Sequence, residues 1–168
     1  MLRKTLLVLL LGTASSHAAQ AAGATLHIEM PHLQVAEYHR PYVAAWLSPK
    51  GSREVTNLML WYQLDDRREG EKWLKDLRQW WRLSGRSLAM PVDGFTGATR
   101  APGTHRIELG KALSALPAGE YTLHVEAARE VGGRELVTLP FNWPAGDTAT
   151  LETQGASELG AIRLEMGR

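Results

Sequence analysis

The sequence predicts a mainly β protein, an antiparallel β-sandwich with one inserted amphipathic helix over about residues 69–83. Three observations carry this prediction. Apolar and polar residues alternate in several short segments, turn-forming residues separate these segments, and only one stretch changes to a helical period. Many short strands with turn signals between them are typical of a sandwich.

The expected strands follow from this alternation. They cover residues 25–30, 41–48, 54–64, 104–109, 119–127, 135–143 and 161–166. The second and third form a plausible hairpin, and Pro140 predicts an edge position for the strand at 135–143, because proline cannot donate a ladder hydrogen bond. Residues 147–160 are small and polar, which predicts a linker or surface loop. The stretch 117–123 also resembles a strand of flagellar-hook-cap-type immunoglobulin-like domains, which implies an immunoglobulin-like sandwich.

The expected helix carries a stripe of large apolar side chains. Trp73, Leu74, Leu77, Trp80 and Trp81 are spaced i, i+1, i+4, i+7 and i+8, which is one face of a helix. Such a stripe is normally packed into the core, because large aromatic side chains dominate burial. The alternative is that the three tryptophans form a flat wall against a ligand.

Length and composition limit the class of protein. The chain has 168 residues, 44% of them hydrophobic and 22% charged, which suits one globular domain over residues 22–168. Its formal net charge is +1, and no run of five like charges occurs, so nucleic-acid binding is excluded. The chain has no cysteine, which removes disulfides, thiolate nucleophiles and iron–sulfur clusters.

The first 21 residues predict a secretory signal peptide. Arg3 and Lys4 precede an apolar run, and Ala19-Gln20-Ala21 is a small-x-small site with cleavage expected after Ala21. The apolar run is too short to span a bilayer, and no later segment approaches the required length. The mature chain is therefore expected in the periplasm, without a transmembrane segment.

Residues 93–103 include many small residues around the Thr99 hydroxyl, and they are expected to form an exposed, tight loop. Gly94, Gly97 and Gly103 are expected to adopt positive φ angles. The small neighbours of Thr99 would leave its hydroxyl accessible.

Asp93, Thr96, Gly97, Ala98 and Thr99 spell the pattern D-x-x-[ST]-G-A-T. This pattern resembles the site at which periplasmic flavin transferases attach FMN to a threonine, as in FMN-binding domains and the flavinylated subunits of sodium-pumping NADH:quinone reductases. The resemblance implies that Thr99 carries the FMN phosphate, that the transferase recognises Asp93 and Thr96, and that Gly97 and Ala98 give clearance. The alternative is a plain Asp-Gly or Thr-Gly turn, because short motifs also occur by chance.

Separate stretches together resemble one family, the predicted periplasmic proteins of domain of unknown function 2271. The matching stretches are residues 40–46, 72–77 with 80–82, 96–99 with 102–103, and 119–130 with 132–135. Such proteins tend to be encoded near a flavin transferase and a PepSY-type membrane flavin reductase, often with iron-uptake genes. The resemblance implies a flavin-linked electron carrier rather than an enzyme with its own substrate. Trp73, Trp80 or Trp81 could stack on the flavin only if the expected helix packs beside the Thr99 loop.

Two other function classes stay open. The first is an immunoglobulin-like binding or assembly module without a cofactor, which would use its loops and an edge strand. The second is a metal- or siderophore-linked binder using His32, His39 or His105. These histidines lack the spacing of known metal motifs, and no metal site is assigned from them.

Overall fold

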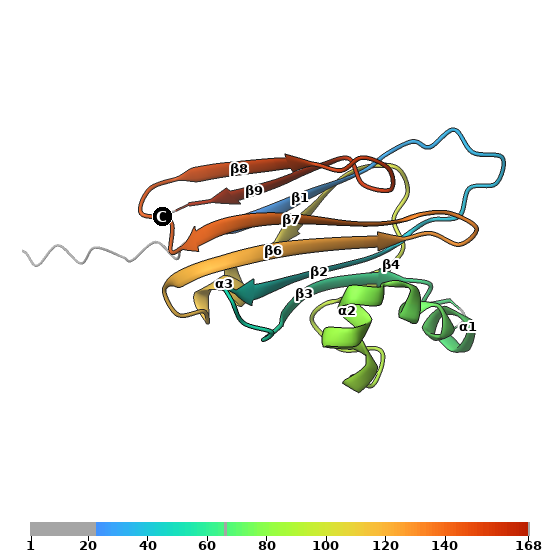
Figure 1. The fold of residues 1–168 in the computed structure, drawn as a ribbon, viewed down its shortest axis with the longest axis horizontal. Coiled ribbons are helices and arrows are strands. Elements are labelled where there is room, and N and C mark those ends of the chain that lie inside the picture. The colour runs from blue at the N-terminus through green and yellow to red at the C-terminus, as the bar shows by residue number, and fades with distance from the viewer. Residues whose placement is uncertain (1–22, 66, 168) are drawn as a thin grey trace, which may run out of the picture.

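Residues 23–65 and 67–167 are described in the computed structural model, where nine strands form two sheets packed face to face (Figure 1). The order is β5-β1-β9-β8 in one sheet and β4-β3-β2-β6-β7 in the other. The bounds are β1 Ala24–Met30, β2 Tyr42–Pro49, β3 Thr56–Tyr62, β4 Thr96–Ala98, β5 Gly103–Glu108, β6 Gly119–Ala128, β7 Arg134–Trp143, β8 Ala149–Gln154 and β9 Ala161–Met166. The expected mainly β sandwich is therefore confirmed.

The strand pairing is antiparallel except at one edge, where β4 runs parallel to β3. The predicted hairpin of β2 and β3 is confirmed. Pro140 lies in β7, which is an edge strand, as its missing N–H donor requires. The expectation of a loop over 147–160 is wrong, since β8 lies there. Its alternate residues are only half-buried at a sheet edge, so the sequence carries no apolar stripe.

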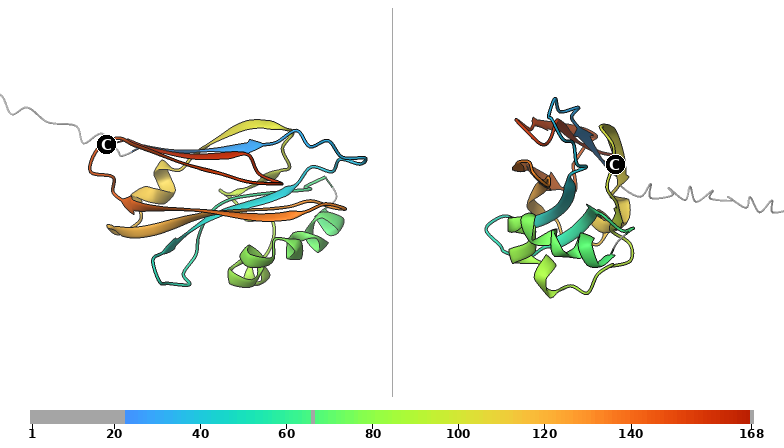
Figure 2. Two further views of the ribbon diagram at one scale, coloured as in Figure 1. Left: turned by 45° about the horizontal axis from the view of Figure 1, so that its top comes forward. Right: turned by 90° about the vertical axis from the view of Figure 1, so that its right-hand side faces the viewer.

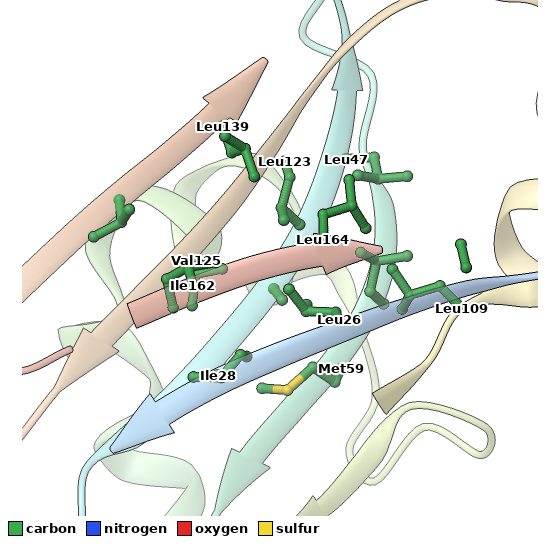
Figure 3. Packing of buried hydrophobic residues seen from close by; sticks show 14 of the residues in the cluster. Leu26, Ile28, Leu47, Met59, Leu109, Leu123, Val125, Leu139, Ile162 and Leu164 are labelled. Carbon is green, nitrogen blue, oxygen red and sulfur yellow. The ribbon is translucent and has the colours of Figure 1, made fainter. Parts of the chain in front are cut away.

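The main core lies between the two sheets. Figure 3 shows aliphatic side chains from β1, β6 and β9 pointing toward one another. They include Leu26, Leu123, Val125, Ile162 and Leu164, each 0% exposed. Burial of each such side chain contributes about 1.5–3 kcal/mol. The short helix α3 (Gly110–Ser114) adds the buried Leu113 to this core.

A helical layer covers the outer face of the five-stranded sheet (Figures 1 and 2). It comprises α1 (Arg67–Lys72), the 3₁₀ helices η1 (Leu74–Asp76) and η2 (Gly85–Ser87), and α2 (Arg78–Leu83). The helical insertion is thus present, but it is broken rather than continuous over 69–83. Leu77, with φ −74° and ψ 69°, leaves the helical region immediately before α2.

The side chains of this layer make a second core. Leu74, Leu77 and Trp80 are almost fully buried against the sheet residues Trp46 and Tyr62. The expected apolar stripe is therefore core at these three positions. Gly85 lies directly on the Trp80 ring, where a Cβ would be 2.4 Å from Cζ3.

The contact between Gly85 and Trp80 predicts that Gly85→Ala destabilises the protein. The indole is buried and cannot move aside freely, so the free energy of unfolding should fall by about 1–3 kcal/mol. Urea denaturation followed by circular dichroism measures this change. Gly110→Ala is the matched control, because a Cβ there has nothing within 4 Å. Equal midpoints for the two variants would contradict the prediction.

Candidate functional site

Thr99 follows the edge strand β4. Residues Thr96, Gly97 and Ala98 pair in parallel with Leu60, Trp61 and Tyr62 of β3. The Leu60 N–H also donates to the Phe95 carbonyl at 2.8 Å. Because β4 has a partner on one side only, its other edge is open. The motif is therefore an edge strand preceded by a turn, rather than the loop expected over its whole length.

A tight turn leads into β4. The Thr96 hydroxyl donates to the Val92 carbonyl at 2.8 Å, and the Thr96 N–H is 3.3 Å from the same oxygen. Gly94 has φ +91° and Gly103 has φ +134°, so both expected positive φ angles are confirmed. Asp93 is exposed at the turn. The Thr96 side chain is thus already engaged in shaping the backbone.

The expectation of positive φ at Gly97 is wrong, because this residue lies in β4. A Cβ at Gly97 would be 3.4 Å from Cδ1 of Trp61. Glycine at this position therefore allows close packing of the strand on an indole. Ala98 is exposed, and Thr99 is half-buried.

A cavity of about 130 Å³ lies beside Thr99. Its walls come from five separate parts of the chain: the segment before β2, the end of β3, η1, the residue after β4, and the end of β6. The lining residues are His39, Arg40, Tyr42, Gln63, Trp73, Asp76, Thr99, Ala128, Arg129 and Glu130. A second cavity of about 640 Å³ shares Trp73, Asp76, Arg129 and Glu130 with the first. The two form one groove that begins at Thr99.

The structure separates the three tryptophans of the predicted stripe. Trp73 is 42% exposed and borders both cavities. Trp80 is 0% exposed, and its Nε1 donates to Asn57 Oδ1 at 2.8 Å. Trp81 packs against the same buried cluster as Trp80 and lines neither cavity. Of the three tryptophans, Trp73 is therefore the one that is open to a ligand at these cavities.

Arg129 and Glu158 form a buried ion pair at the groove. Arg129 Nε donates to Glu158 Oε2 at 2.8 Å, and Nη2 donates to Oε1 at 3.0 Å. The hydrogen bond to Glu158 raises the pKa of Arg129 further. Burial raises the pKa of Tyr42, so its hydroxyl remains neutral. The Arg129 guanidinium is therefore immobile at the groove, its charge is balanced by Glu158, and a neutral phenol lies nearby.

Glu126, Arg129 and Glu130 are charged residues at the end of β6, and the alternating pattern places Glu126 on the polar side of that strand, yet Glu126 is buried. It is 0% exposed, and its carboxylate accepts the N–H groups of Gln79 and Trp80 at the start of α2. Arg129 is largely buried as well, and only Glu130 of this group is exposed.

The candidate metal-binding histidines lie apart. His39 lies between Glu37 and Glu130, at 3.0 and 3.6 Å. His105 contacts the Ala101 carbonyl at 2.8 Å. No group of three or more potential metal-binding side chains occurs among the described residues.

Sequence reasoning missed most of the groove around Thr99. Tyr42, Gln63, Asp76 and Arg129 occur in unrelated local patterns, and no motif links them. They converge because β2 begins where β3, β4 and β6 end. Pairing of the expected strands could have placed Tyr42 and Ala128 together, but not the helical residues.

A family model described as a predicted periplasmic protein (DUF2271) matches residues 23–161. The chain belongs to this family. No curated protein and no solved structure shows a significant match.

The family description agrees with the localisation expected for this DUF2271 protein, which we assign to the periplasm. The expected signal peptide at 1–21 lies outside the described residues. Among residues 23–65 and 67–167, no helix is long and apolar enough to cross a membrane.

Glu135 supports the loop that carries Glu158, the partner of Arg129. Its carboxylate accepts backbone N–H groups of residues 156–159. Burial alone would raise the pKa of Glu135, but these donors outweigh it and lower the pKa. A carboxylate with a lowered folded-state pKa stabilises the protein above its ordinary pKa. This contribution disappears as the pH falls through the lowered value.

Glu135→Gln should therefore lower the urea midpoint at pH 7, and its difference from the parent should shrink below about pH 4. Denaturation series between pH 7 and pH 3 test this. Glu152→Gln is the control, because Glu152 is exposed and its contact with Arg163 is 4.0 Å long. A difference for Glu135→Gln that is constant with pH would show that the charge is not involved.

Proposed function

We propose that this protein is a periplasmic electron carrier with FMN covalently bound to Thr99. The observation that carries the proposal is that the threonine of the D-x-x-T-G-A-T pattern borders a groove with the exposed indole of Trp73 and the immobile guanidinium of Arg129. If residues 93–99 formed only a plain turn, the groove beside Thr99 would have no explanation. Membership of DUF2271 supports the periplasmic setting.

The attachment step uses the Thr99 hydroxyl as nucleophile. Its oxygen forms a bond to the FMN phosphorus of FAD, the pyrophosphate bond to the AMP half breaks, AMP leaves, and a base of the flavin transferase takes the hydroxyl proton. The open edge of β4 and the exposed Asp93 and Ala98 give the transferase access. The Thr96 hydroxyl stabilises the turn by donating to the Val92 carbonyl. Thr96 would therefore contribute to recognition by setting the shape of the backbone.

The groove fits a tethered group rather than an enclosed one. Ligand pockets are commonly about 300–1,000 Å³, so the 130 Å³ cavity beside Thr99 cannot enclose FMN alone. The adjoining 640 Å³ cavity extends the available space past Trp73. Trp73 would hold an aromatic ring on its exposed face.

Bound FMN would supply one- and two-electron transfer. The chain itself would hold the group at the surface and shield one side of it. The proposed partners are the flavin transferase and a membrane flavin reductase of the PepSY type, with a link to iron uptake. These partners follow from the family resemblance stated for residues 40–135.

The alternative is a binding or assembly module without a cofactor. The feature that favours it is the exposed edge of the four-stranded sheet at β8, which has no proline to block pairing with another strand. This protein would remain colourless when produced with a flavin transferase.

Coexpression with a periplasmic flavin transferase should add one FMN to the wild-type protein, and Thr99→Ala should carry none. Thr99→Ser should retain the modification, because serine supplies the same hydroxyl. Intact mass, fragmentation and an absorbance spectrum measure these outcomes. Thr104→Ala, at an exposed position of β5, is the control and should be modified fully. FMN on Thr99→Ala, or none on the wild type, would refute the assignment.

Trp73→Leu should increase the fluorescence of the attached flavin several-fold, because a tryptophan in contact with a flavin quenches its excited state by electron donation. Trp81→Leu should leave the fluorescence unchanged, since Trp81 lines neither cavity. Circular dichroism confirms that both variants are folded. Equal fluorescence in the two variants would mean that Trp73 does not contact the flavin.

A further inference from the structure

A second hollow lies on the same outer face of the five-stranded sheet, at the other end of β2. Tyr42 of β2 borders the Thr99 cavity, whereas Ser48 borders this second hollow. Ser48 lies six positions after Tyr42 along the strand, which corresponds to about 20 Å. The hollow has a volume of about 810 Å³ and is lined by Ser48, Ser52, Arg53, Gln79, Arg82, Leu83, Arg86 and His124. We call it the arginine cleft.

Three arginines from separate elements meet at the arginine cleft. Arg53 comes from the connection between β2 and β3, Arg82 from α2 and Arg86 from η2. All three are exposed, and none forms an ion pair with an acidic residue of the described chain. No carboxylate lines the cleft. The whole chain has a formal net charge of only +1, so this is a local excess of positive charge.

Neutral side chains that are held in place by other residues also line the arginine cleft. The His124 ring stacks on Trp46 with 4.9 Å between centroids and 3° between planes. Its Nε2 lies 2.8 Å from Ser48 Oγ. Burial lowers the pKa of His124, which keeps the ring neutral at neutral pH. Ser52 Oγ accepts the Glu54 N–H, which leaves the Ser52 hydroxyl proton available for a ligand.

We propose that the arginine cleft binds a small molecule that carries two or more negative charges on phosphate or carboxylate groups. The guanidinium group donates paired hydrogen bonds that match the oxygens of both groups. The concave shape and the volume suit a small ligand. This site does not depend on Thr99 or on a flavin.

Isothermal titration of the mature protein with pyrophosphate and with citrate at low ionic strength tests the proposal. At least one should bind with 1:1 stoichiometry, and the stronger ligand identifies the phosphate or the carboxylate class. Arg53→Gln and Arg86→Gln should each weaken binding about tenfold, as expected for lost hydrogen bonds between charged groups. Thr99→Ala should bind as the wild type does, which separates this result from the flavin proposal.

The double variant Arg106→Gln/Arg163→Gln is the matched control. It removes as much charge as the double variant Arg53→Gln/Arg86→Gln, but from the four-stranded sheet. It should change the dissociation constant less than twofold. Equal weakening by the two double variants would show a general effect of net charge and overturn the site. Absence of binding by both anions would overturn it as well.

Discussion

The buried carboxylate of Glu126 holds the helical layer on the sheet. It is 0% exposed on β6, accepts two N–H groups of α2 at 2.8 and 3.0 Å, and pairs with Arg134 Nη1 at 2.9 Å. A charge removed from water is strongly unfavourable unless such partners surround it. The N-terminus of a helix offers unsatisfied donors that favour an anion. The start of α2 can therefore occupy only a narrow range of positions over β6.

This constraint also determines the groove beside Thr99. Two residues after Glu126, β6 reaches Ala128 and then Arg129, while η1 immediately precedes α2 and follows Trp73. The wall with Trp73 and the wall with Arg129 are thus positioned by the same interaction. The wall with Thr99 has a different origin, because the parallel pairing of β4 with β3 places it. The groove exists where the helical layer and the sheet edge meet.

The alternating pattern was sufficient to predict the strands whose inner residues face the core, such as β1, β6 and β9. The pattern failed to predict β8, whose residues alternate between half-buried and exposed. It also failed to predict that a polar residue of β6 is buried. A strand pattern does not distinguish a polar side that faces water from one that lies beneath helices, and Glu126 lies beneath them. The motif at Thr99 was readable because its residues are adjacent in sequence. The groove could not be predicted from the sequence, because its walls depend on how five distant segments pack.

The dimensions of the groove bear on why a carrier of this kind would use a covalent bond. A cofactor held in this groove by contacts alone would have to offset the loss of translational and rotational freedom on association. A phosphoester to Thr99 would remove that requirement, since a tethered group stays at high local concentration. The protein can then leave the cofactor open on one side. Electron transfer between proteins becomes faster as the distance between the cofactors shortens, and an exposed cofactor lets a partner approach closely. A shallow groove beside Thr99 would therefore suit the proposed carrier, in which a second protein has to reach a tethered cofactor.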